Sequence, residues 1–189
     1  MENNFILETL KKSLNENVIV SIFTNRNAPE KCICGFIDAI SVEQFSIKHI
    51  SVDGFYDGYK VRRIEDIFRV DISGKYEDRL KYLYTYRNQS HTDFLKSKSN
   101  SDSNLFKEGL LSAKGLNMVV TVCINETEEQ NYIVGWVKNV TETEVIISNI
   151  SDSGEIDGES VFYIEDIVKL CCDTENESVL GILNQRSNP

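Results

Sequence analysis

The segment Ile64-Glu65-Asp66-Ile67 is repeated 100 residues later as Ile164-Glu165-Asp166-Ile167. The match extends without a gap around both segments: between residues 5–83 and 105–183, 21 of 79 aligned pairs are identical. A repeat of about 80 residues is longer than the unit of a solenoid and has the size of a small domain. The sequence therefore predicts two domains of one fold.

Both copies predict the same order of elements. An amphipathic stretch with apolar residues every three or four positions predicts a helix over 5–14 and over 105–115. Five short runs rich in β-branched and aromatic residues, separated by polar turns, predict strands. A helix followed by five short neighbouring strands indicates a small antiparallel barrel, so we expect a mainly β fold with short helices and two tandem five-stranded barrels. The strands are expected at 18–25, 32–40, 45–51, 59–63 and 68–72, and at 118–125, 132–140, 145–151, 160–163 and 168–172.

Leucines at helical spacing predict a closing helix after each barrel, over 76–87 and over 177–185. Between the copies, residues 89–104 are rich in serine and poor in apolar side chains, which is typical of a flexible linker. The expected domains are therefore residues 1–88 and residues 105–189.

The net charge of −10 belongs to the second copy. Residues 1–88 carry 13 basic and 13 acidic side chains, whereas residues 105–189 carry 5 basic and 15 acidic ones. Two copies of one fold thus differ in electrostatics. This indicates that only the first copy can approach a polyanion, unless the acidic surface serves solubility alone.

No apolar run reaches the 18 or so residues of a membrane span, and the start of the chain lacks a basic leader, which predicts a soluble protein. The odd number of cysteines suits the reducing cytoplasm. Cys32 and Cys34 are expected on one face of a strand, as core residues rather than metal ligands, because structural zinc normally needs four ligands. We expect no metal and no cofactor.

Three features shared by both copies are expected to be structural. A glycine within the second strand marks a sharp bend or the close approach of another backbone. An Asp-Gly dipeptide suits a tight turn, and it offers too few oxygens for calcium. The acidic pair at the corner before the last strand is expected to cap backbone N–H groups rather than to catalyse a reaction. These residues are Gly35, Gly135, Asp57, Gly58, Asp157, Gly158, Asp66 and Asp166.

With the helix, the central Gly35 or Gly135 and the Ile-Glu-Asp-Ile corner, each copy resembles an Sm-like or SH3-like barrel. The turns Asp-Ala-Ile-Ser and Lys-Asn-Val-Thr before the third strand add to the resemblance. The family comprises the RNA-binding Sm, Lsm and Hfq proteins, and the C-terminal domain of the ribosome maturation factor RimP is similar. The resemblance implies RNA binding in rings that assemble through strand edges. The chain departs from it at Arg62-Arg63, where the family carries Arg-Gly, and in the second copy, where the arginine is missing.

Single-stranded RNA is bound by cations that follow the phosphates and by aromatic rings on which bases stack. The first copy offers such residues on its strands and turns, whereas the second copy has mostly neutral ones at the equivalent positions. The alternative is that these residues are simply the solvated face of a sheet. The candidate RNA-binding residues are Lys31, Lys48, His49, Lys60, Arg62, Arg63, Tyr56 and Tyr59.

The leading hypothesis is therefore a non-catalytic RNA-associated protein whose first module contacts single-stranded RNA. No nucleophile-and-base motif, phosphate-binding loop or dinucleotide motif is present, so we expect no enzyme. The alternative is a protein-binding adaptor, or an acidic inhibitor of the immunity type, that has kept the barrel and lost RNA binding. In that case the acidic surface would meet a basic partner; its residues are Glu126, Glu128, Glu129, Glu142, Glu144 and Glu155. A homo-oligomer or ring through strand edges is a further expectation.

Overall fold

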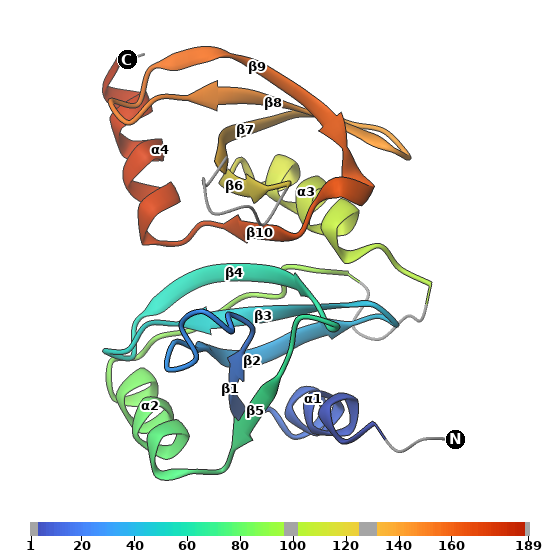
Figure 1. Cartoon of the computed structure of the whole chain (residues 1–189). Coiled ribbons are helices and arrows are strands. Elements are labelled where there is room, and N and C mark those ends of the chain that lie inside the picture. The colour runs from blue at the N-terminus through green and yellow to red at the C-terminus, as the bar shows by residue number, and fades with distance from the viewer. Residues whose placement is uncertain (1–3, 97–101, 125–131, 188–189) are drawn as a thin grey trace. The chain divides into compact units, whose positions relative to one another are not determined.

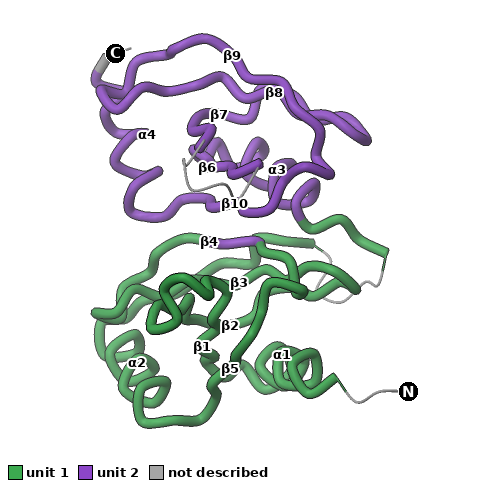
Figure 2. The backbone as a smooth tube through the Cα atoms, viewed as in Figure 1, with its two compact units in different colours: residues 1–58, 62–105 green, residues 59–61, 106–189 purple. Residues whose placement is uncertain are grey.

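The computed structural model describes residues 4–96, 102–124 and 132–187 and divides the chain into two compact units (Figures 1 and 2). One unit comprises residues 1–58 and 62–105, and the other comprises residues 59–61 and 106–189. The first half of the chain forms α1 (Phe5–Glu16), β1 (Ile19–Phe23), β2 (Ile33–Ile40), β3 (Gln44–Ile50), β4 (Tyr56–Arg63), β5 (Arg69–Ile72) and α2 (Lys75–Tyr86). The second half forms α3 (Leu105–Leu116), β6 (Val119–Cys123), β7 (Tyr132–Val140), β8 (Glu144–Ile150), β9 (Ile156–Tyr163), the 3-10 turn η1 (Ile164–Asp166), β10 (Lys169–Cys172) and α4 (Glu175–Ser187).

The prediction of a mainly β fold with short helices is confirmed. Both halves have the same strand order, β5-β1-β2-β3-β4 in the first and β10-β6-β7-β8-β9 in the second. Among the described residues the two end strands of each order are not paired with one another, so closure into a barrel is not observed. Closure depends on the tilt and shear added up over all five strands, which local sequence patterns do not encode. No helix of these ranges is long and apolar enough to cross a bilayer.

Alternating side chains of the first sheet pack against two different helices. Leu10 of α1 is buried with Val20 and Ile22 of β1 and with Ile47 of β3. The intervening positions of the strands face α2, whose residues Leu80 and Tyr84 pack with Ile19, Phe36 and Ile50. The period of two in the strands thus separates the layer of α1 from the layer of α2.

A buried carboxylate joins the closing helix to the first strand in each half. The Ser21 hydroxyl on β1 donates to Glu77 on α2, and the N–H of Gly74 donates to the same carboxylate at 3.0 Å. In the second half, Thr121 Oγ1 lies 2.5 Å from Glu177 Oε1, and the N–H of residue 174 donates to Glu177 Oε2 at 2.8 Å. Each glutamate therefore caps its helix and also holds it against the sheet.

The Asp-Gly dipeptides predicted to form turns lie inside strands. The turn is formed earlier, where the Gly54 N–H donates to the carbonyl of Ser51 at 2.9 Å. On β9, Asp157 and Gly158 stand opposite the single residue Asn149, because the register runs from the pair Ser148 and Glu159 to the pair Ile150 and Ile156. This is a β-bulge with a glycine in the left-handed region, at φ 76° for Gly158 and 66° for Gly58. The glycine of each Asp-Gly dipeptide thus has the positive φ that such a dipeptide favours. The prediction that the dipeptide forms a tight turn was wrong, because it lies inside a strand.

The duplicated corner is held mainly by its isoleucines. Ile67 and Ile167 are buried, and their N–H groups donate to the carbonyls of Ile64 and Ile164 at 3.0 and 3.2 Å. Apolar burial and a backbone turn thus account for the repeated segment. The capping role expected of Asp66 and Asp166 stays a prediction.

Gly35 and Gly135 stand where the neighbouring strand comes closest. A Cβ atom at Gly35 would lie 1.9 Å from the carbonyl oxygen of Lys48 on β3, and one at Gly135 would lie 2.0 Å from the carbonyl oxygen of Ser148 on β8. Both obstacles are backbone atoms, which cannot swing aside as a side chain can. Of the two roles expected for these glycines, the close approach of another backbone is confirmed.

Replacing Gly135 with alanine should lower the free energy of unfolding by about 3 kcal/mol, because the strands must separate to admit the methyl group. The single tryptophan, Trp136, is adjacent and reports unfolding by its fluorescence in urea. Gly115→Ala in α3 is the control, since a Cβ there meets nothing within 4 Å and should stabilise the helix by about 0.5 kcal/mol. Equal midpoints for Gly135→Ala and the wild type would contradict the packing constraint.

Candidate nucleic-acid interface

The cations predicted on the strands of the first unit are largely held in ion pairs. Lys48 Nζ lies 3.0 Å from Asp93 Oδ1 and 3.4 Å from Asp38 Oδ1, and Asp38 is buried. His49 Nδ1 lies 2.7 Å from Asp57 Oδ2. These carboxylates compete with a phosphate for the same cations, so the strand residues are a weaker RNA site than the sequence indicated.

Three of the other predicted cations lie on β4 and the fourth lies on the loop before β2. Arg63 Nη1 lies 3.7 Å from Glu65 Oε1 at the corner after β4. Lys60 and Arg62 are half-buried on β4, whereas Lys31 is exposed on the loop before β2. Of the six predicted cations, all within the described residues, Lys31 alone is classed as exposed.

The two predicted stacking residues do not present open rings. Tyr59 is only 1% exposed. Tyr56 is half-buried, and its ring centroid lies 4.4 Å from that of His91. The prediction that these tyrosines stack on bases therefore needs correction. The ring of Tyr59 is buried, and the ring of Tyr56 packs against His91.

Residues 89–96, which the sequence predicts to be flexible, pack against the first unit. The N–H of Tyr56 donates to Gln89 Oε1 at 3.0 Å, and the N–H of Leu95 donates to Asp38 Oδ2 at 3.2 Å. Phe94 and Leu95 are buried. This 89–96 segment therefore belongs to the first unit, because its two apolar side chains and the carboxylate of Asp38 hold it there.

Within the 89–96 segment, His91 contacts both β4 and α2. Its Nε2 lies 3.2 Å from the carbonyl oxygen of Gly58, and its Nδ1 lies 2.7 Å from the hydroxyl of Tyr84. Because a carbonyl only accepts, Nε2 carries the proton and Nδ1 accepts from Tyr84. Burial, together with the nearby Lys48 and His49, lowers the pKa of His91 to about 4, although hydrogen bonds to the carbonyls of Gly58 and His49 act to raise it. The ring is therefore neutral near pH 7.

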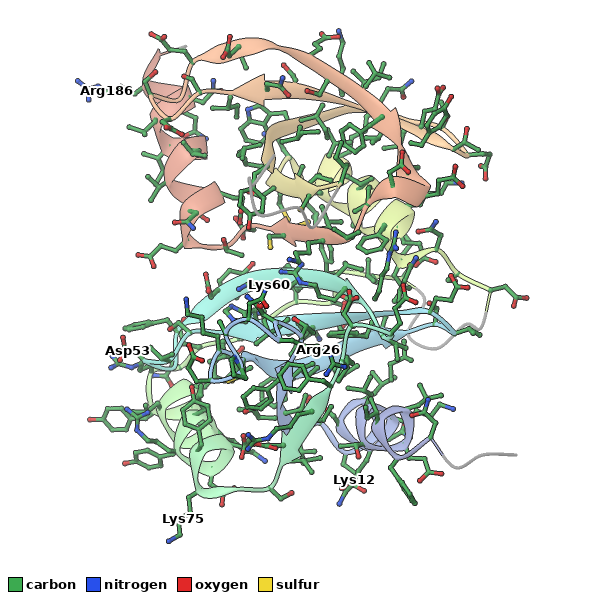
Figure 3. All side chains as sticks on the ribbon, in the orientation of Figure 1. Lys12, Arg26, Asp53, Lys60, Lys75 and Arg186 are labelled. Carbon is green, nitrogen blue, oxygen red and sulfur yellow. The ribbon has the colours of Figure 1, made fainter. Side chains whose placement is uncertain are left out.

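An exposed stripe on α2 carries the cations and rings that the strands do not offer. We call Lys75, Arg79, Tyr82 and Tyr86 the α2 stripe. Their spacing of four, three and four residues places them on one face of the helix. That face points away from the sheet, because Leu80 and Tyr84 on the opposite side pack into the core. Figure 3 labels Lys75, which extends outward at the start of the helix.

The rings of the α2 stripe lie parallel and accessible. Tyr82 and Tyr86 are 68% and 72% exposed, and their centroids are 5.9 Å apart with an angle of 20° between the planes. At the end of the helix, the Arg87 guanidinium lies 4.2 Å from the ring centroid of the exposed Phe55. Glu77 faces inward to Ser21, whereas Asp78 is exposed in the same helical turn, three residues after Lys75.

The α2 stripe has no counterpart in the second unit. On α4 the equivalent positions are Glu175, Val179, Ile182 and Arg186, with one acid, two aliphatic residues and one cation. The sequence predicted this helix from its buried leucines alone. The signal that was missed is the recurrence of a cation or tyrosine at the first, fifth, eighth and twelfth residues of the helix.

No protein-family model, curated protein or solved structure matches this chain. The residues that carry the Sm-like resemblance are placed as follows. Asp38, at the position of the loop acid of that family, lies within β2 and is engaged by Lys48 and by the N–H of Leu95. Arg62 and Arg63 lie on β4. The Sm-like assignment remains an expectation.

The acidic residues expected to meet a basic partner are only partly described. Glu126, Glu128 and Glu129 lie outside the described residues. Lys107 Nζ lies 2.6 Å from Glu142 Oε2, and Glu144 is exposed. Glu155 is also exposed, and in the described ranges no three His, Cys, Asp or Glu side chains converge as ligands for a metal.

His91 should make the attachment of the 89–96 segment pH-dependent. The unfolded chain binds a proton at His91 below a pKa of about 6.5, whereas the folded chain does so only near 4, so stability falls as the pH falls between these values. The loss should be on the order of 2–3 kcal/mol by pH 4. An NMR titration of the ring protons measures the folded pKa directly, and His91→Gln assigns the signal among the two histidines.

Hydrogen exchange of residues 89–96 gives the second readout for this prediction. The protection factors of the wild type, which are the intrinsic exchange rates divided by the observed ones, should fall between pH 6.5 and pH 4, and His91→Gln should remove that fall. A midpoint for His91 near its ordinary value would show that the ring is not enclosed as described.

Proposed function

We propose that this protein binds single-stranded RNA without catalysis, and that the first unit makes the contact through the α2 stripe. The observation that carries the proposal is the pair of parallel, exposed rings of Tyr82 and Tyr86 beside Lys75 and Arg79. Aromatic faces accept bases of any sequence, and neighbouring cations bind the phosphates between them. The proposed site thus differs from the strand residues that the sequence favoured.

The spacing along the helix supports a polymeric ligand. Lys75 and Tyr86 are 11 residues apart, which corresponds to about 16 Å along the axis. A stripe of that length has room for several nucleotides, whereas a single small anion would use one cation. The first copy is also neutral overall, while the second is strongly acidic and would repel a phosphate chain.

We further propose that each unit is a relative of the Sm-like barrels. Support comes from the helix before the strands, the sequential five-strand order and the glycine at the close approach of the second and third strands. In this proposal the RNA surface has moved from the strand loops to the closing helix, because the 89–96 segment engages Asp38, Lys48 and Tyr56.

Assembly with another protein, including a second copy, is the second candidate function. The observation that favours it is β9, which ends the strand order of the second half and exposes Ile156, Val161 and Tyr163. An end strand with exposed apolar side chains is able to pair with a strand from another chain. In this proposal the second unit contributes assembly and the first contributes RNA binding.

The RNA proposal is tested with a fluorescein-labelled single-stranded oligonucleotide pool in an anisotropy titration of the full chain. Tyr82→Ala with Tyr86→Ala should weaken binding by roughly tenfold or more, because each lost stacking contact costs about 1–3 kcal/mol. The matched control is Val179→Ala with Ile182→Ala on α4, which is also exposed and should leave binding unchanged. Equal affinity of both double variants would contradict the proposal, and no binding at low salt would favour the adaptor.

The phosphate contacts are tested separately through salt dependence. Lys75→Ala with Arg79→Ala should reduce the slope of log affinity against log salt by about 1.4, since each contact with a single strand contributes about 0.7. The tyrosine variants should leave that slope unchanged. A slope that stays the same in the Lys75 and Arg79 variant would place the phosphates elsewhere on the protein.

The assembly proposal is tested by measuring mass in solution with light scattering after size exclusion. Val161→Lys places a charge on the exposed face of β9 and should shift an oligomer toward the monomer, because a lysine on an end strand opposes pairing. Val179→Lys on α4 provides a control with the same change of charge. A wild-type protein that stays monomeric at high concentration would contradict self-assembly.

A further inference from the structure

Two cysteines at the start of β2 lie close enough to react with each other. Cys32 Sγ and Cys34 Sγ are 3.3 Å apart, and both cysteines are free thiols. Residues two apart on an extended chain point to the same side, which explains why the sulfurs meet. A disulfide bond of about 2.05 Å needs a further approach of the two sulfurs of roughly 1.2 Å, with a local adjustment of the chain that brings the two Cβ atoms closer.

The surroundings of Cys34 favour its ionised form. The Cys34 thiol lies 3.4 Å from Ser21 Oγ and 4.0 Å from the hydroxyl of Tyr76. The hydrogen bond with Cys32 is the main cause that lowers the pKa of Cys34 to about 7, against burial and the neighbouring Glu77, which raise it. The same hydrogen bond raises the pKa of Cys32. Cys34 is thus the thiol that loses its proton first.

The pair is not needed to build the fold. The second unit carries Tyr132 and Val134 at the equivalent positions and forms the same strand. It keeps the hydrogen bond beneath them, with Thr121 and Glu177 in place of Ser21 and Glu77. Within the described residues no third ligand completes a metal site at the pair. Cys34 lies in the apolar cluster beneath α2 and Cys32 packs against that cluster, as expected of core residues, so any thiol chemistry is additional to packing.

We propose that Cys32 and Cys34 form a reversible disulfide when the protein meets a hydroperoxide. The Cys34 thiolate attacks one oxygen of the peroxide, the O–O bond breaks, and Cys34 becomes a sulfenic acid while hydroxide leaves. The Cys32 sulfur then attacks Cys34, the S–O bond breaks, and the departing hydroxide takes the Cys32 proton to form water. The two thiols lose two electrons in total, and hydrogen peroxide is reduced to two waters.

The burial of Cys34 limits the size of the oxidants that can reach its sulfur. Cys34 is 4% exposed, whereas Cys32 is half-buried. Hydrogen peroxide is small enough to reach a thiolate at such a site, and a bulky disulfide such as oxidised glutathione is not. The sulfenic acid forms beside Cys32, so the second step needs no diffusion and leaves little time for further oxidation.

The test is peroxide treatment of the reduced full-length protein, followed by catalase, alkylation in denaturant and tryptic peptide mapping. Both cysteines fall in one tryptic peptide, residues 32–48, so a disulfide removes both alkylation sites and two hydrogens from a single mass. Cys123, Cys171 and Cys172 serve as internal controls and should stay alkylated. Oxidation should slow as the pH falls below 7, because a smaller fraction of Cys34 is then ionised.

Two serine variants test the order of the steps. In Cys32→Ser the sulfenic acid at Cys34 has no partner and should be trapped when dimedone is added together with denaturant after the peroxide, whereas Cys34→Ser should give no adduct at Cys32. An adduct at Cys32 in the second variant would overturn the assignment of Cys34 as the attacking residue. The proposal is overturned as a whole if peptide 32–48 keeps both alkylation sites at a dose that oxidises free cysteine, or if all five cysteines react alike.

Discussion

A buried carboxylate at the start of each closing helix is the contact on which the other features depend. Glu77 accepts hydrogen bonds from the Ser21 hydroxyl on β1 and from the Gly74 N–H. It thereby fixes both the position and the rotation of α2, so that the α2 stripe faces outward. The same serine lies 3.4 Å from the Cys34 thiol. Ser21 therefore contacts both the carboxylate that positions the α2 stripe and the proposed redox pair. Leaving a buried carboxylate without partners is costly, which explains why both copies keep this arrangement.

The two copies show how one scaffold supports different surfaces. The positions that contact each other inside the fold match closely: Gly35 with Gly135, Ile67 with Ile167 and Glu77 with Glu177. The outward positions have diverged, from Tyr82 to Ile182 on the closing helix and from Cys32 to Tyr132 on the second strand. Packing constrains interior residues through many neighbours at once, whereas an exposed side chain is constrained mainly by what it binds.

The 89–96 segment explains why several of the predicted strand residues are already engaged by other side chains of the first unit. Lys48, His49 and Tyr56 have the composition of an RNA surface, but Asp93 pairs with Lys48 and His91 packs on Tyr56. A serine-rich stretch gives no local signal of this, because the segment has only Phe94 and Leu95 to bury and its other contacts are single hydrogen bonds to distant residues. The neighbours of a cation decide whether it is available to a phosphate, and Asp93, which pairs with Lys48, is 45 residues away from it in the chain.

The sequence alone determined the duplication, the order of helices and strands and the two glycines at the close approach of strands, because periodicity, turn residues and an internal repeat act locally. It also located the positive φ of Gly58 and Gly158, although not the bulge that uses it. The tertiary structure decided which strands end the sheet, which cations are paired and which face of α2 is exposed. It also brought Cys32 to within 3.3 Å of Cys34 beside Ser21 and Tyr76. Apart from the approach of the two cysteines to each other, which strand alternation predicts, these features depend on distances between residues far apart in the chain, which only the folded protein defines.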